Sequence, residues 1–184
     1  YVVQNPAKKK QLVKACLSQL AARTAAELIV CVARTDRIDE MAKLNISEFP
    51  FPEAPAPVKK YYKFIPYNYK TGYFNAFGHF KKVAFKVARS LDKQLPVSAF
   101  HPADAKLWAS KTTALACENL VLALRAYGFD SCMIEGFDEP MVRKILKLNE
   151  QQYVVMVIAA GERAKDGVFF PQYRFDRELF IQKV

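Results

Sequence analysis

The sequence has few of the residues through which side chains commonly carry out chemistry. Only 2 of its 184 residues are histidines, and it contains no Gly-x-Ser-x-Gly elbow, no His-Glu-x-x-His pair and no Walker A loop. His79 lies in an aromatic segment and His101 precedes a proline, so we expect a surface or packed histidine and a solvated one rather than a general base. The sequence therefore predicts no catalytic side chain, and any reaction would depend on a cofactor.

Cysteines are few, and their spacing is not that of metal ligands. The 4 cysteines form no Cys-x-x-Cys pair, so we expect no metal site. Each lies in an apolar context, which favours buried free thiols and a reducing, cytoplasmic compartment. The cysteines are Cys16, Cys31, Cys117 and Cys132.

Long apolar runs are also absent. No stretch reaches the roughly eighteen apolar residues of a membrane span, so we expect no membrane-spanning segment. Residues 1–6 lack the basic and apolar regions of a signal peptide. Because the chain begins without Met, in what resembles a strand already under way, we expect it to start inside a larger domain.

The composition is that of a globular protein with an excess of positive charge. Hydrophobic residues make up 52% and charged residues 25%, which suits one domain over residues 1–184. The net charge of +10 has two interpretations: solvated basic faces, or a site for anionic ligands such as the phosphates of a nucleotide cofactor. No helix-turn-helix or RNP-like pattern supports a nucleic-acid partner.

The apolar pattern predicts helices and strands in an α+β arrangement. Continuous apolar runs of strand length favour a central sheet covered on both faces, and the order of elements indicates a mixed sheet layered with helices. Half of the ten prolines lie in residues 45–66, which predicts an irregular connection there. We expect helices at 6–20, 73–91, 104–127 and 139–148, strands at 1–4, 28–33, 129–134 and 153–160, a loop at 92–103, and a basic then apolar tail at 171–184 that docks on a partner surface or a sheet.

The most informative segment is the one that runs from Gly128 to Gly136. Gly128 suits the left-handed conformation that often ends a helix, and a short apolar strand follows. That strand leads directly into Glu135 and Gly136, where the lack of a side chain on glycine lets the backbone come close to a flat ligand. The segment therefore favours a backbone-lined binding site.

Three parts of the sequence carry a resemblance to a known family. They are Gln19 with residues 25–30, then residues 108–111 with 126–130 and 134–137, and finally residues 154–161 with 171–175. Together they resemble the flavin-dependent nitroreductase family over nearly the whole chain. The resemblance implies a nitroreductase-like fold with a central mixed sheet flanked by helices. It also implies that residues 45–103 form an irregular and helical insert over the site.

The resemblance implies a set of FMN-binding residues, and each also has a purely structural interpretation. Met133 and Ile134 would form an apolar wall for the flavin ring, or would simply be strand core. The backbone N–H groups of Glu135 and Gly136 would face the ring, or would belong to a plain turn. Gln19 would bind the pyrimidine edge through its amide, or would be a surface residue at a helix end.

The phosphate site implied by the resemblance is incomplete in this sequence. Arg174 would hold the phosphate through its bidentate guanidinium, unless it is a solvated charge on the tail. The family commonly places a second cation where this chain has Gln172. Two amino-terminal segments of the family that bear on the flavin, one of them rich in arginine, do not occur here, and we expect that the sequence omits that stretch.

The function implied by the resemblance is that of an FMN-dependent oxidoreductase. NAD(P)H would reduce the flavin, and a nitroaromatic, a quinone or another small-molecule acceptor would then take the electrons in a ping-pong reaction. The resemblance also implies a homodimer whose subunits share the flavin sites, with no nucleic-acid or membrane partner. The alternatives are a flavin-free relative acting as a binding or assembly module, a basic domain that associates with nucleic acid, and a dehalogenating or ring-modifying relative.

Overall fold

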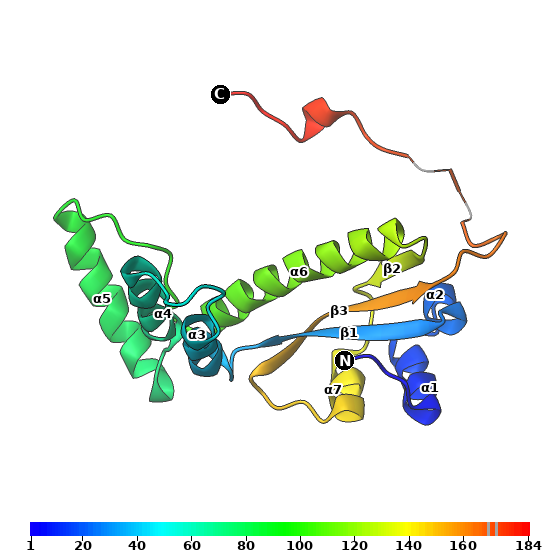
Figure 1. Ribbon diagram of the computed structural model, residues 1–184, viewed down its shortest axis with the longest axis horizontal. Coiled ribbons are helices and arrows are strands. Elements are labelled where there is room, and N and C mark those ends of the chain that lie inside the picture. Colours follow the sequence, from blue (N-terminus) through cyan, green and yellow to red (C-terminus); the bar gives the residue numbers. More distant parts are fainter. Residues whose placement is uncertain (169, 172) are drawn as a thin grey trace.

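The structure is a computed structural model that describes residues 1–168, 170–171 and 173–184. Helices lie on both sides of a three-stranded sheet, and a helical insert gathers at one end (Figure 1). The strands are β1 (Glu27–Arg34), β2 (Asp130–Ile134) and β3 (Gln152–Gly161). The α-helices are α1 (Pro6–Ala15), α2 (Leu20–Thr24), α3 (Ile38–Ser47), α4 (Ala56–Tyr69), α5 (Ala76–Ser90), α6 (Pro102–Ala126) and α7 (Glu139–Leu146). The 3-10 helices are η1 (Tyr73–Asn75) and η2 (Arg177–Leu179).

The sheet has β3 at its centre, between β1 and β2. A bridge between Val2 and Ile29 places the first residues along the outer edge of β1. The α+β class and the layered helices are confirmed. The expected mixed sheet is wrong, because every strand pairing among the described residues is antiparallel. α7 is only 8 residues long, and with its loops it returns the chain to the neighbouring strand at the same end of the sheet, which produces an antiparallel pair.

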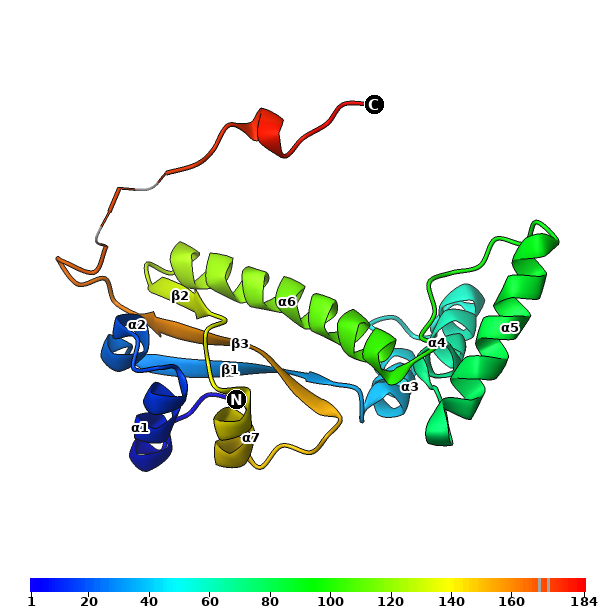
Figure 2. The ribbon, with the colours of Figure 1, turned by 180° about the vertical axis from the view of Figure 1, so that it is seen from behind.

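The two faces of the sheet bury different sets of side chains. On one face, Leu12 of α1 and Val142 of α7 pack with Val30 of β1. On the other face, Cys117 of α6 packs with Ile158 of β3. Figures 1 and 2 show α6 along one side of the sheet and α1 and α7 on the opposite side. Both long strands are therefore covered on both faces, which explains their continuous apolar sequences.

The proline-rich segment contains more helix than predicted. Residues 45–66 were expected to be irregular, but the last turn of α3 and most of α4 lie within them. Pro57 lies in the first turn of α4, where the missing N–H has no helical partner to lose. Pro66 lies inside α4, where it removes one backbone hydrogen bond. Three of the five prolines fall in the short connection 48–55, which is the irregular part of this segment. The prediction was wrong because it extended the irregular structure to the other two prolines, which α4 accommodates.

The first helix is shorter than predicted. The apolar spacing indicated one helix over residues 6–20, but α1 ends at Ala15. Leu17 and Ser18 then adopt φ of 55° and 54°, and the N–H of Ser18 donates to the carbonyl of Val13 at 3.0 Å. The apolar spacing continues through this turn, so periodicity could not reveal it. The consequence is that Gln19 stands at the start of α2 rather than inside a helix.

The long central helix begins with a reciprocal cap. The carboxylate of Asp104 accepts from the backbone N–H groups of Phe100 and His101, each at 2.9 Å. The Nδ1 atom of His101 accepts from the N–H of Ala103 at 3.2 Å. His101 is exposed, as expected, and its ring also satisfies a helix donor.

The thiols differ in exposure. All four are free, with Cys16 and Cys117 buried and Cys31 partly buried. Burial, together with a hydrogen bond to Cys117, raises the pKa of Cys31 to about 12, so this thiol stays protonated at neutral pH. Cys132 is exposed, which contradicts the expectation that every thiol is buried, because it lies on the edge strand β2.

Candidate functional site

A single hydrogen bond joins two of the predicted site segments. The Nε2 atom of Gln19 donates to the backbone carbonyl of Gly136 at 2.7 Å, across 117 positions of the sequence. A methyl group placed on Gly136 would lie 3.3 Å from that Nε2 atom, so the glycine permits the close approach. The fold therefore brings Gln19 and Gly136 together.

The loop that carries Gly136 is held at both ends. It leaves β2 at Ile134, and the N–H of Asp138 donates to the carbonyl of Ala15, at the end of α1, at 2.8 Å. The carboxylate of Asp138 accepts from the N–H of Met141 at 2.9 Å and so caps α7. Together with the Gln19 contact, these bonds fix residues 135–138 between β2, α1 and α7.

The backbone donors of this loop face no partner within the described part of the chain. The N–H groups of Glu135 and Gly136 form no hydrogen bond with any described residue, and both residues are exposed. The Oε1 atom of Gln19 likewise accepts no hydrogen bond from a described residue. The loop and Gln19 thus offer two backbone donors and one amide acceptor. That set matches the polar needs of a flavin ring.

Met133 and Ile134 lie on opposite faces of the sheet. Met133 pairs with Ile158, which faces α6, whereas Ile134 pairs with Val157, which faces α1 and α7. Ile134 is 2% exposed and Met133 is 44% exposed. The Ile134 side chain therefore lies in the core, and of these two residues Met133 is the one with an accessible apolar side chain next to the loop.

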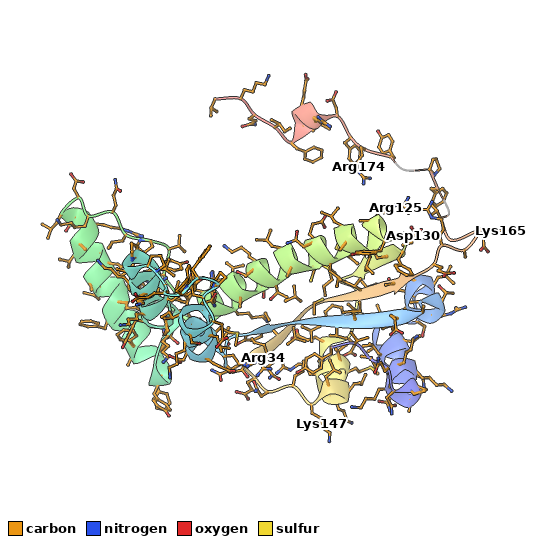
Figure 3. All side chains as sticks on the ribbon, in the orientation of Figure 1. Arg34, Arg125, Asp130, Lys147, Lys165 and Arg174 are labelled. Carbon is orange, nitrogen blue, oxygen red and sulfur yellow. The ribbon has the colours of Figure 1, made fainter. Side chains whose placement is uncertain are left out.

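Of the two predicted phosphate ligands, the one that the structure describes, Arg174, does not join this cluster. Arg174 lies on the extended tail, where its Nη1 donates to the carbonyl of Tyr173 at 2.9 Å. Figure 3 shows Arg174 on the α6 side of the sheet, whereas Gln19 connects α1 to α2. Gln172 lies outside the described residues. The fold of one chain therefore does not place Arg174 beside Gln19 and Gly136.

Sequence reasoning missed a charged cluster at the end of the sheet. Asp130 forms ion pairs with Arg163 and with Arg125, the latter at 3.0 Å (Figure 3). The hydrogen bond from Arg163, more than any other contact, lowers the pKa of Asp130. A cavity of about 570 Å³ beside this cluster is lined by Asp130, Arg163, Cys132 and Ala25 among others. The only signal in the sequence was alternating charge at the ends of predicted elements, which is too common to be diagnostic.

Two further classes of site have no support in the described residues. No helix described here is long and apolar enough to cross a bilayer. No group of three or more His, Cys, Asp or Glu side chains is placed to hold a metal ion in the described part of the chain.

The fold is shared with proteins of one class. The chain superposes over its full length on a nitroreductase family protein from Streptococcus pneumoniae, with a TM-score of 0.66 and 20% identity over 77% of that protein. It also superposes over its full length on a candidate nitroreductase from Exiguobacterium sibiricum, solved in complex with FMN, with a TM-score of 0.62 and 16% identity over 75% of that protein. At these identities the likeness shows the fold alone, which is a nitroreductase-like α+β fold.

Sequence comparison then gives the family. The model of the nitroreductase family matches residues 1–162, so the chain belongs to that family. One relative, an NADH dehydrogenase from Thermus thermophilus, is 36% identical over 76 residues, or 41% of this chain and 36% of the relative. The matches to curated relatives span 28% to 36% of their length.

Proposed function

We propose that this protein is an FMN-dependent oxidoreductase that takes electrons from NAD(P)H and passes them to a small-molecule acceptor. The observation that carries the proposal is the hydrogen bond from Gln19 to Gly136, which presents the free donors of the 135–136 loop beside a glutamine amide. Membership of the nitroreductase family and the FMN complex of the Exiguobacterium protein support the cofactor. The name of the Thermus relative supports a nicotinamide donor.

The residues of this chain would bind and orient the cofactor rather than react with the substrates. When bound, FMN would supply hydride acceptance from NAD(P)H and electron delivery to a nitroaromatic, a quinone or a similar acceptor in a ping-pong cycle. Gln19 would accept from and donate to the pyrimidine edge, and the N–H groups of Glu135 and Gly136 would face the ring. Met133 would cover one side of the ring. Ile134 would support the loop from the core.

We propose that the phosphate is held by a second copy of the chain. Arg174 lies on a tail whose apolar residues Leu179, Phe180 and Ile181 are exposed, so this tail has apolar surface to bury against a partner. The outward side of α6 exposes Leu115 and Leu122 as well. A homodimer would cover both surfaces and would let Arg174, with Gln172, reach the partner's phosphate site.

The helical insert would also act across the dimer. Figures 1 and 2 show α3, α4 and α5 at the opposite end of the molecule from α2. Within one chain the insert therefore does not cover Gln19. In the proposed dimer, residues 45–103 would approach the partner's site and restrict which acceptors enter.

The test is reconstitution with FMN followed by kinetics. The folded protein is expected to take up FMN and then to oxidise NADH or NADPH in the presence of a nitroaromatic or a quinone. Double-reciprocal plots at several acceptor concentrations should be parallel, as a ping-pong scheme requires. A folded protein that takes up no FMN would contradict the proposal and would favour the flavin-free binding module.

A further inference from the structure

Two thiols and one thioether come together between α6 and the sheet. Cys31 of β1 pairs with Met156 of β3 in the antiparallel register, and both residues belong to the core cluster on the α6 face of the sheet. Cys117 of α6 belongs to the same cluster and forms a hydrogen bond with Cys31. The fold therefore gathers sulfur atoms from three separate elements.

An irregularity of the sheet coincides with this sulfur cluster. Cys31 pairs with Met156, but the next residue, Val32, pairs with Val154, so Val155 is an extra residue in β3. Along the described pairing of β1 with β3, the register shifts at no other point. A bulge of this kind redirects the neighbouring side chains and is over-represented beside functional sites. Here it places Val155 and Met156 both in the cluster that α6 covers.

The surroundings of the sulfur cluster favour a soft ion of low charge. In the part of the chain that the structure describes, no histidine or carboxylate completes a metal-binding group with Cys31 and Cys117, so the four ligands of a Zn²⁺ site are not present there. Thiolate and thioether sulfur are the ligands that Cu(I) selects. The cluster also includes apolar side chains, which disfavour a dication: Ile29, Leu120, Val121, Leu124, Val155 and Ile158.

Burial leaves the sulfur cluster both protected and accessible. Cys117 and Met156 are 1% and 8% exposed, so little water competes with them for an ion. Cys31 is only partly buried, which leaves a route for an ion to enter. Because all three residues belong to one chain and lie beneath α6, the cluster needs no free outer surface and is compatible with the proposed dimer.

We propose that Cys31, Cys117 and Met156 bind one Cu(I) ion. Each of the two thiols releases its proton to solvent and forms one Cu–S bond. Met156 adds a lone pair from its neutral thioether, and the copper is neither oxidised nor reduced. The expectation of no metal site relied on the spacing of cysteines in the sequence, which cannot reveal ligands that three elements bring together. This site does not depend on the proposed oxidoreductase activity.

The test is transfer of Cu(I) from its coloured bicinchoninate complex to the reduced full chain without oxygen. We expect uptake of one equivalent, measured by the loss of colour. Cys117→Ala should weaken binding at least about a hundredfold, since loss of even an outer-shell partner costs about tenfold to a hundredfold. Cys16→Ala is the matched control, because Cys16 is 0% exposed but packs on the other face of the sheet, and it should bind as the unchanged protein does.

The thioether is tested by Met156→Leu, which keeps an apolar side chain of similar volume. It should weaken Cu(I) binding about tenfold, because one soft ligand is lost, whereas Met141→Leu on α7 should have no effect. Thermal melting confirms that each variant is folded. Cu(I) should raise the melting temperature of the unchanged protein but not that of Cys117→Ala, since binding to the folded state stabilises it.

Several outcomes would overturn the proposal. One is a folded, reduced protein that takes up no Cu(I), and another is equal affinity of Cys117→Ala and Cys16→Ala. Uptake that is lost in Cys132→Ser but kept in Cys117→Ala would assign the copper to the exposed thiol of Cys132 instead. Binding of Zn²⁺ that displaces Cu(I) and is lost in Cys117→Ala would contradict a site for a soft monovalent ion.

Discussion

At the scale of single residues, Gln19 is the centre of the proposed site. Its side chain donates to Gly136 and leaves an amide oxygen and a second N–H free to meet a ligand. The sequence predicted both residues of this contact, but it could not predict the hydrogen bond, because their 117-residue separation is closed only by the packing of α1 and α7 on the sheet.

Gln19→Leu is expected to weaken FMN binding about tenfold, the worth of one lost hydrogen bond in a partly enclosed site. The unfolding temperature should change little, because the residue is exposed. Titration of FMN by fluorescence quenching measures the effect. Gln151→Leu, which changes an exposed glutamine at the far end of the sheet, is the control, and equal affinities of the two variants would count against the site.

Gly78 is required by contact distance rather than by backbone conformation. Helix propensity alone predicts that Gly78→Ala stabilises the protein by about 1 kcal/mol. The 2.1 Å approach of the new methyl group to the Phe100 carbonyl instead predicts a loss of about 2 kcal/mol or more in the free energy of unfolding. Urea denaturation distinguishes these two expectations, because they predict changes of opposite sign in the free energy of unfolding.

Asp36 links stability to pH. Hydrogen bonds from Arg34 at 2.8 and 2.7 Å lower the pKa of the carboxyl to about 2. The pKa of the Asp36 carboxyl is lower in the folded protein than in the unfolded chain, where it is near 4. The stabilisation by the Arg34 contact is therefore complete above about pH 4 and is lost as the pH falls toward 2. Asp36→Asn should therefore cost about 1 kcal/mol at pH 7 and much less at pH 2. Denaturant titrations measure the free energy of unfolding of both proteins at each pH. If Asp36→Asn cost the same at pH 2 as at pH 7, the ion pair with Arg34 would be contradicted.

At the scale of elements, the sequence predicted best the two long strands and the long helix α6. The apolar runs at 28–33 and 153–160 became β1 and β3, because strands covered on both faces need apolar residues at every position. The helix at 104–127 was found within two residues at its start and one at its end. The insert was missed in part, since α4 tolerates Pro57 and Pro66, and proline density alone cannot distinguish tolerated positions from forbidden ones.

Pro66 allows a test of this interpretation. As a residue inside α4 it leaves the carbonyl four positions earlier without its usual helical donor. Pro66→Ala should restore that bond and raise the free energy of unfolding by about 1 kcal/mol, after allowing for the greater freedom of the unfolded chain. A fall in the thermal midpoint would mean that the proline ring makes packing contacts worth more than the missing bond.

At the scale of the whole molecule, the proposed site is divided between two places. Gln19 and Gly136 lie together, while Arg174 extends away on the α6 side (Figure 3). The sequence predicted these three residues as ligands of the cofactor. It could not predict their separation, because the path of a tail depends on what the tail packs against. A dimer that exchanges tails would reunite the parts.

Arg174→Ala is expected to weaken FMN binding by about tenfold to a hundredfold, the range for a charge-assisted phosphate contact. Arg177→Ala, on the same exposed tail, is the control. Mixed dimers of Gln19→Leu and Arg174→Ala subunits test the sharing directly. Shared sites would give one intact, tightly binding site in each mixed dimer, whereas sites built within one chain would leave none.

The central claim, that the junction of Gln19 with the 135–136 loop holds a flavin, is tested most directly by titrating the purified full-length protein with FMN and following flavin fluorescence and visible absorption. The account predicts saturable, equimolar binding with a shifted flavin spectrum, weakened by Gln19→Leu and unchanged by Gln151→Leu. A folded protein that leaves the flavin spectrum unchanged at all concentrations would contradict it.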